Sequence, residues 1–104
     1  MSAATRPADS RWDALAIHAD DDVAVALHDL AAGDEATVRR AGSVEAVRLL
    51  DAIGLGHKFA LRAIAIGAPI RKYGERIGIA TAAIGIGNHV HVHNLASARA
   101  RNPR

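Results

Sequence analysis

Short runs in which apolar residues alternate with polar or small ones dominate the first two thirds of the chain. Residues 12–18 alternate in this way and then meet three aspartates at positions 20–22, a composition that favours a polar turn. Residues 23–28 alternate large with small side chains, and residues 57–61 alternate after Gly56. A period of two residues is the signature of a β-strand. The pattern therefore predicts several short strands.

A seven-residue pattern occurs four times: an apolar residue, two spacers, a glycine, two spacers and a second apolar residue. Its copies span residues 30–36, 53–59, 64–70 and 84–90. Each copy is too short to be a solenoid unit, which needs about 20 or more residues. The pattern is typical of one recurrent turn, in which glycine adopts a positive φ and the chain reverses into a new strand. Four such turns predict a compact all-β fold.

One segment fits two kinds of secondary structure. Val44, Val47 and Leu50 have helical spacing behind Ser43, which is a suitable helix N-cap, but the same segment can also be a strand. We therefore expect an all-β domain of short strands and glycine turns that contains at most one short helix or helical turn.

The two ends of the chain differ in composition from the part between them. Residues 1–11 are small, polar and charged, as is usual for a loose terminus, and residues 96–104 are polar and basic. We expect a flexible N-terminus at 1–11, one domain over residues 12–95 and a basic C-terminal tail at 96–104.

Residues 87–94 concentrate the candidate chemistry of the chain. Three of its six histidines occur here at alternate positions, His89, His91 and His93, separated by two valines. In a strand the three imidazoles share one face while the valines face a core. Neighbouring histidines of this set are then about 6.6 to 6.8 Å apart along the backbone, and the outer two are about 13 Å apart. One metal ion could take two of the three, and an exposed edge strand without a ligand stays an alternative.

Composition narrows the function classes. The chain has 104 residues, no cysteine and three aromatic residues, so any metal must be held by imidazole and oxygen ligands. Its net charge of +2 comes partly from arginines near the C-terminus, and it has no basic face laced with aromatic residues. We therefore expect no nucleic-acid partner. No apolar window approaches the ~18 residues of a membrane span, so we expect no membrane partner and a cytoplasmic location.

Three blocks, taken together, resemble a known family. They are residues 56–61 (Gly-His-Lys-Phe-Ala-Leu), residues 72–78 with Lys-Tyr-Gly followed by Ile-Gly, and residues 87–94 (Gly-Asn-His-Val-His-Val-His-Asn). Their order and spacing resemble the SAF (β-clip) domain of altronate and galactarate dehydratases, which in some systems is a separate small subunit. The same architecture occurs in the α subunit of sulfolactate sulfo-lyase, so water and bisulfite are both candidate leaving groups.

The resemblance implies a β-elimination that converts an anionic 2,3-dihydroxy sugar acid into a 2-keto acid, with ferrous iron, manganese or another divalent metal. It implies catalytic roles for His57 and His91. We expect His91 and His93 to face the metal or substrate, with His57 and Lys58 at the same mouth. The expected metal ligands are His89, His91 and His93, and the expected substrate-binding residues are Lys58 and Asn94.

This domain alone lacks the ligands for a full metal sphere, so we expect a large dehydratase subunit to share the metal and carry most catalytic residues. Without that subunit the chain should be inactive, and the sequence leaves room for a homo-oligomer. Two alternatives stay open, a ligand-binding SAF module without chemistry and a purely structural subunit.

Overall fold

The computed structural model describes residues 12–97, so the predicted N-terminal segment 1–11 and most of the predicted tail lie outside the described residues. Within this range the chain forms nine short strands and no helix, which confirms the predicted all-β class. The strands are β1 Ala14–Ala16, β2 Val23–Ala26, β3 Glu35–Arg40, β4 Ser43–Arg48, β5 Lys58–Ala60, β6 Pro69–Lys72, β7 Glu75–Ala80, β8 His89–Val90 and β9 Leu95–Ser97.

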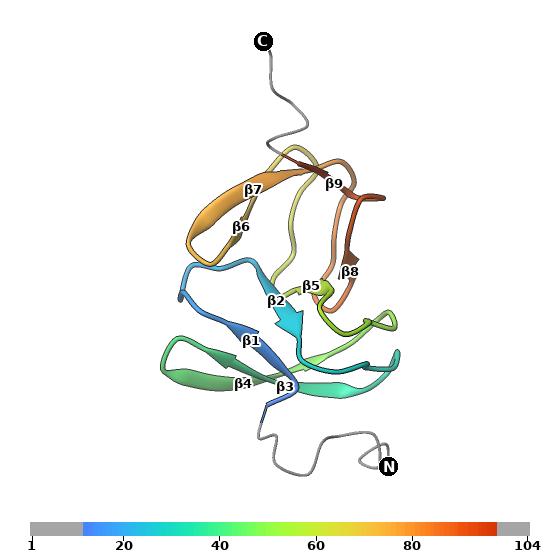
Figure 1. Ribbon diagram of the computed structural model, residues 1–104. Helices are drawn as coiled ribbons and strands as arrows, with labels where there is room; N and C mark the ends of the chain where they lie inside the picture. Colours follow the sequence, from blue (N-terminus) through green and yellow to red (C-terminus); the bar gives the residue numbers. More distant parts are fainter. Residues whose placement is uncertain (1–11, 98–104) are drawn as a thin grey trace.

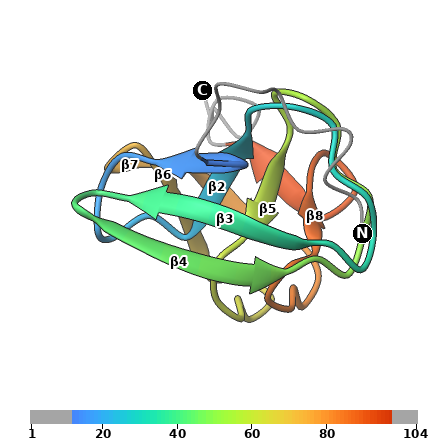
Figure 2. The same ribbon diagram turned by 90° about the horizontal axis from the view of Figure 1, so that it is seen from below.

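The strands form two sheets (Figure 1). The larger sheet has the order β4-β3-β1-β2-β5-β8, and the smaller has the order β6-β7-β9. All pairings between these strands are antiparallel except that of β1 with β3, which is parallel. Figure 2 shows the long β3–β4 hairpin crossing one end of the molecule, with β8 on the side away from the hairpin turn. The short strand β8 is therefore an edge of the larger sheet.

Aliphatic side chains build two buried clusters. The first contains Phe59 with alanines and valines of β1 to β4, and the second joins Ile70 and Val90 under the smaller sheet. Strand β5 contributes to both, because Phe59 belongs to the first cluster and the next residue, Ala60, belongs to the second. The alternation of side chains along a strand explains this division. Strand β5 thus connects the two cores and carries His57 at its start.

The four copies of the seven-residue pattern form the same turn, as predicted. Their central glycines all have a positive φ, between 81° and 89°: Gly33, Gly56, Gly67 and Gly87. In each copy a backbone hydrogen bond closes a four-residue turn, as from the N–H of His57 to the carbonyl of Gly54 at 2.9 Å. A positive φ at the third position is the mark of a type II turn. The last residue of each copy is completely buried: Ala36, Phe59, Ile70 and Val90.

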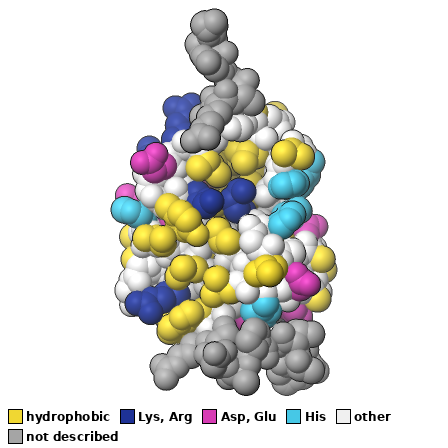
Figure 3. Space-filling view, in the orientation of Figure 1, with side chains coloured by type: hydrophobic (Ala, Val, Ile, Leu, Met, Phe, Trp, Pro, Cys, Tyr) yellow, Lys and Arg dark blue, Asp and Glu magenta, His cyan; other side chains and the backbone are white. Residues whose placement is uncertain are grey.

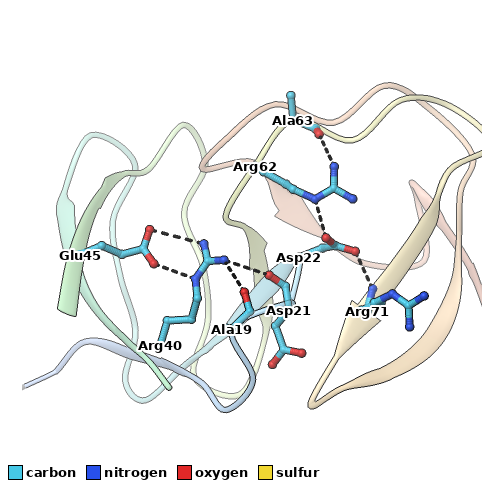
Figure 4. Close-up of polar contacts among 8 residues, drawn as sticks. All are labelled: Ala19, Asp21, Asp22, Arg40, Glu45, Arg62, Ala63 and Arg71. Atoms are coloured by element: carbon cyan, nitrogen blue, oxygen red, sulfur yellow. Dashed lines mark hydrogen bonds and ion pairs between the residues drawn. The ribbon is translucent and has the colours of Figure 1, made fainter. Parts of the chain in front are cut away.

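Two buried aspartates connect the sheets (Figure 4). Asp22 precedes β2, and its carboxylate accepts hydrogen bonds from the side chain of Arg62 and from the main-chain N–H of Arg71 at 2.8 Å. Asp21 accepts a hydrogen bond of 2.8 Å from the N–H of Gly74, in the turn between β6 and β7. We call Asp21 and Asp22, with these partners, the aspartate clamp.

The clamp corrects the expectation of a solvated aspartate turn. The turn is present, but Asp21 and Asp22 are only 1% and 3% exposed. They are buried because main-chain N–H groups of the smaller sheet need acceptors where the chain passes between the sheets.

Two further predictions from the sequence can be compared with the observed strands. The segment that fitted either a helix or a strand is strand β4, paired along its whole length with β3. The last strand, β9, runs to Ser97, so the domain extends two residues beyond the predicted boundary at residue 95. In the part of the chain that the structure describes, no helix is long and apolar enough to cross a membrane.

Candidate metal and substrate site

The candidate site lies at the edge of the larger sheet, where β5 meets β8. Antiparallel pairing sets Phe59 opposite His89 and Lys58 opposite Val90. Continuing this register places His57 opposite His91, just beyond the last pair of the ladder. Figure 3 shows histidine side chains gathered at one edge of this face of the molecule, next to apolar side chains. Two segments about 30 residues apart in the chain thus supply one group of imidazoles.

Three imidazoles converge on one small volume. One nitrogen from each of His57, His89 and His91 lies within 4.8 Å of the other two, and no other group of three or more candidate metal ligands occurs among residues 12–97. The Nδ1 atom of His57 and the Nε2 atom of His89 are 2.9 Å apart. The ring centroids are 4.9 to 5.4 Å apart, and the rings of His89 and His91 are stacked. The contact between His57 and His89 is a hydrogen bond, in which one ring nitrogen donates and the other accepts, and the three rings together could hold a metal ion.

The histidine segment is not one continuous strand. Strand β8 ends at Val90, and residues 91–94 form a turn in which the N–H of Asn94 donates to the carbonyl of His91 at 3.0 Å. The valine expected to face the core, Val92, is 79% exposed. The prediction of an alternating strand through His93 is therefore wrong beyond Val90.

The side chain of Asn94 explains the turn. Its Oδ1 atom accepts a hydrogen bond from the N–H of His91 at 2.9 Å, and its Nδ2 atom donates to the carbonyl of His89 at 2.8 Å. A short amide side chain that bonds to nearby main chain competes with ladder formation. Asn94 is also only 7% exposed, so its amide serves to hold the histidine turn. The geometry does not support the expected direct contact between Asn94 and substrate.

The turn also changes the position of His93. Its ring centroid lies 5.6 Å from that of His89, whereas a straight strand would separate the two residues by about 13 Å along the backbone. His93 is exposed and does not belong to the convergent group of three. Of the three expected ligands, the structure therefore brings His89 and His91 together and joins them with His57 in place of His93.

The carboxylate of Asp51, which no sequence pattern indicated, is hydrogen-bonded to the main chain of the site. The Oδ2 atom of Asp51 accepts hydrogen bonds from the N–H of His89 at 2.8 Å and from the Nδ2 atom of Asn88 at 3.0 Å. These two bonds, the one from His89 first, hold the pKa of Asp51 below its ordinary value. Asp51 and His89 are far apart in the chain, and no spacing pattern connects them. Asp51 fixes the main chain that carries His89.

The protonation state of His89 suits a ligand. Burial, followed by the neighbouring His57, His91 and His93, lowers the pKa of His89 from its ordinary value, and the opposing influence of Asp51 is smaller. A lower pKa favours the neutral ring, which is the form that binds a metal. The lowered pKa therefore favours His89 as an electron-pair donor.

The structure does not place Lys58 with the histidines. Lys58 shares its face of the ladder with its register partners Val25 and Val90, whereas Phe59 and His89 occupy the other face. Burial and then the charge of Lys72 lower the pKa of Lys58. The expected contact between Lys58 and a substrate carboxylate stays a prediction. This contact would lie on the opposite side of β5 from His57.

The three convergent residues fit a divalent metal. Two nitrogens bound at right angles to one ion, each at about 2.1 Å, lie about 3.0 Å apart, close to the 2.9 Å between His57 and His89. Imidazole suits iron and zinc better than it suits magnesium or calcium. Three nitrogen donors also leave positions of an octahedral ion free for substrate oxygens. Ferrous iron, the first metal expected from the resemblance, is compatible with imidazole ligands and stays a prediction.

The sequence comparisons identify the family. Residues 12–98 match the family described as the altronate/galactarate dehydratase SAF domain. The chain belongs to this family. The SAF domain is 51% identical over 80 residues to altronate dehydratase of Escherichia coli (strain K12) and 40% identical over 80 residues to altronate dehydratase of Bacillus subtilis (strain 168). It is also 45% identical over 49 residues to the (2R)-sulfolactate sulfo-lyase subunit alpha of Chromohalobacter salexigens.

The extent of these matches differs between the two enzymes. The alignments with the altronate dehydratases cover 77% of this chain but 15% of each relative. The alignment with the sulfo-lyase subunit covers 47% of this chain and 52% of that relative. This SAF domain therefore spans a small part of an altronate dehydratase, whereas the sulfo-lyase subunit is a short chain of comparable size.

Proposed function

We propose that this SAF domain is the small subunit, or the corresponding part, of a lyase that removes water from a 2,3-dihydroxy sugar acid such as altronate. The convergence of His57, His89 and His91 carries the proposal, because it supplies a metal-binding group in a domain that is 51% identical to a segment of an altronate dehydratase. The product would be a 2-keto acid.

The three convergent histidines would hold a divalent metal, with ferrous iron the best match and manganese the runner-up. When bound, such an ion would stabilise the negative charge that develops on the carboxylate and 2-hydroxyl oxygens of the substrate. His57, for which the resemblance implied a catalytic role, takes a ligand role in this proposal, because its Nδ1 atom lies 2.9 Å from the Nε2 atom of His89. Asp51 positions His89 through its main chain.

The reaction needs a proton carrier as well as ligands. A base removes the C2 proton, the C3–O bond breaks, and an acid protonates the departing hydroxyl so that it leaves as water; the enol then becomes the keto acid. His93 is exposed, lies beside His89 and is outside the ligand group, and an imidazole can act as an acid or a base. We assign this role to His93 in place of His91.

A large dehydratase subunit would supply the remaining groups. Three imidazoles fill half of an octahedral sphere, and the cluster lies open at a sheet edge. The matched segment is 15% of the altronate dehydratases, so most of each relative lies outside this domain. We expect the chain alone to be inactive. The expected cytoplasmic location and the option of a homo-oligomer stay predictions.

A second candidate is the alpha subunit of a sulfolactate sulfo-lyase. It is favoured by the similarity to two relatives named as such, of which the alignments cover 52% and 70%. The same proton removal would then expel bisulfite instead of water. The leaving group would sit where the large subunit closes the site, so we expect that subunit to select between water and bisulfite.

The test is reconstitution with a large-subunit homologue that corresponds to the part of an altronate dehydratase outside the SAF segment. The assay supplies ferrous ion and tests altronate, galactarate and sulfolactate in turn. We expect one of these substrates to give a 2-keto acid, and only when both chains are present. The preferred substrate decides between the two candidates. Equal turnover by the large subunit alone would reject a catalytic role and leave the ligand-binding or structural alternatives.

A further inference from the structure

Exposed apolar side chains surround the histidine cluster. Two of the type II turns lead directly into the cluster, and the tip of each carries a large aliphatic residue: Leu55 precedes His57 by two positions, and Ile86 precedes His89 by three. Leu55 is 64% exposed and Ile86 is 50% exposed. A turn tip in solvent is usually polar or contains proline or glycine. Two exposed aliphatic side chains therefore lie at turns that lead into the histidine cluster.

Two more apolar residues complete this rim. Leu50 is 56% exposed, and its N–H donates to the carbonyl of Gly87 at 3.0 Å, so it lies against the turn that contains Ile86. Val92 lies between His91 and His93 in the histidine turn and is exposed, as both of these neighbours are. We call these four side chains the apolar rim: Leu50, Leu55, Ile86 and Val92.

The rim continues into a hollow on the neighbouring surface. Leu55 forms one wall of this hollow, which has a volume of about 630 Å³, and Leu27 and Leu30 form other parts of its lining. Leu27 is itself 39% exposed. A hollow lined mainly by aliphatic side chains is suited to receive apolar side chains of another protein. The rim and the hollow together form one surface around and beside the cluster.

We propose that the apolar rim and its hollow are the docking surface for the large subunit of the same lyase. This inference rests on the proposed function. The occupant is chosen because the matched segment is only 15% of the altronate dehydratases, so a much larger protein part must be placed against this domain. A ring of apolar contacts around a polar centre excludes water from that centre. The partner surface should therefore be apolar at its margin and carry oxygen donors that face the histidines.

The test measures the affinity of the full chain for the same large-subunit homologue, by sedimentation or calorimetry. Leu55→Glu and Ile86→Glu should each weaken binding by about tenfold or more, since each buries a charge at the interface. Val92→Glu should act in the same direction and cannot disturb the core, because Val92 is 79% exposed. Val44→Glu is the matched control, because Val44 is 55% exposed on β4, at the opposite edge of the larger sheet.

Each outcome of this experiment separates docking from function. Weaker binding by the three rim variants, with Val44→Glu within twofold of the wild type, supports the docking surface. Unchanged binding by the rim variants in a complex that forms keto acid overturns it and leaves the proposed function intact. A rim-dependent complex without turnover on any substrate of the panel supports docking and rejects the function. Self-association of the free chain that the rim variants abolish makes a second copy the occupant and overturns the proposal.

Discussion

Two groups of ionisable side chains in this domain are built in opposite ways. In the aspartate clamp, buried carboxylates accept hydrogen bonds from main-chain N–H groups and from an arginine, so donors and acceptors match within the chain. In the histidine cluster, three basic rings face one another, and the nearest carboxylate, Asp51, bonds to main chain rather than to a ring. The clamp is complete without a ligand, whereas the cluster is arranged to receive one.

This difference gives each group a different purpose. A buried carboxylate that is fully hydrogen-bonded fixes two elements together, and removing it strands its partners. Converging imidazoles contribute little to folding, since none of the three is fully buried and each meets rings of the same kind. We therefore expect the clamp to control the stability of the domain and the cluster to control its binding properties.

The largest expected effect on stability comes from the clamp. Replacement of Asp22 by Ala should lower the free energy of unfolding by about 3 kcal/mol, because it leaves the N–H of Arg71 and the side chain of Arg62 without their acceptor. His91→Ala should change the same quantity by less than about 1 kcal/mol, because the side chain is exposed. Urea unfolding followed by circular dichroism measures both. Equal losses for the two variants would remove the distinction between clamp and cluster.

An intermediate effect, on metal affinity, is expected from replacing Asp51, which is hydrogen-bonded to the main chain of His89. Asp51→Asn should weaken divalent-metal binding by about tenfold. The neutral amide oxygen accepts hydrogen bonds more weakly than the carboxylate oxygen, so the main chain of His89 is held less firmly. Asp34→Asn is the matched control, because Asp34 also accepts a main-chain hydrogen bond but lies outside the cluster. Calorimetric titration should show normal affinity for that control. Normal affinity of Asp51→Asn would show that the carboxylate has no part in positioning.

The smallest expected effect is a loss of stability in acid. Burial alone would raise the pKa of Asp21, but hydrogen bonds from the main chain of Gly74 and His18 outweigh it and lower the pKa below its ordinary value of 3.8. A carboxyl group with a lowered pKa in the folded state stabilises the protein fully above its unfolded value, and this contribution disappears as the pH falls through the folded value. The free energy of unfolding should therefore decrease as the pH falls below about 4.

Asp21→Asn tests the source of that acid effect. The variant should be less stable than the wild type at pH 7, and the difference between them should shrink as the pH is lowered below 4. A constant difference across the range would show that the charge of Asp21 does not contribute to the clamp.

The turns were the part of the fold that the sequence predicted best. Glycine is the residue that adopts a φ near 85° at little cost, and the apolar residue three positions later marks re-entry into a core. Both requirements are local, so the pattern around Gly33, Gly56, Gly67 and Gly87 was sufficient to predict each turn. The ambiguous segment at residues 43–50 was settled by pairing with β3, a contact that local spacing does not contain.

The histidine edge was predicted in composition but not in geometry. Alternation suggested a strand through His93, but the amide of Asn94 closes a turn and the ladder with β5 ends at Val90. His57 was expected at the same mouth, and the register of β5 with β8 places it there. The supporting carboxylate of Asp51 could not be predicted, because the contact between residues 51 and 89 depends on the packing of distant turns.

The measurement that tests the account most directly is a titration of the full chain with Co²⁺, a spectroscopic substitute for ferrous ion, followed by visible absorption. We expect one saturable site, with affinity reduced by at least about 100-fold in His89→Ala and unchanged in His28→Ala, whose ring bonds to Asp13 instead. Circular dichroism confirms that both variants are folded. Equal affinity of the wild type and His89→Ala would contradict the assignment of His57, His89 and His91 as a metal site.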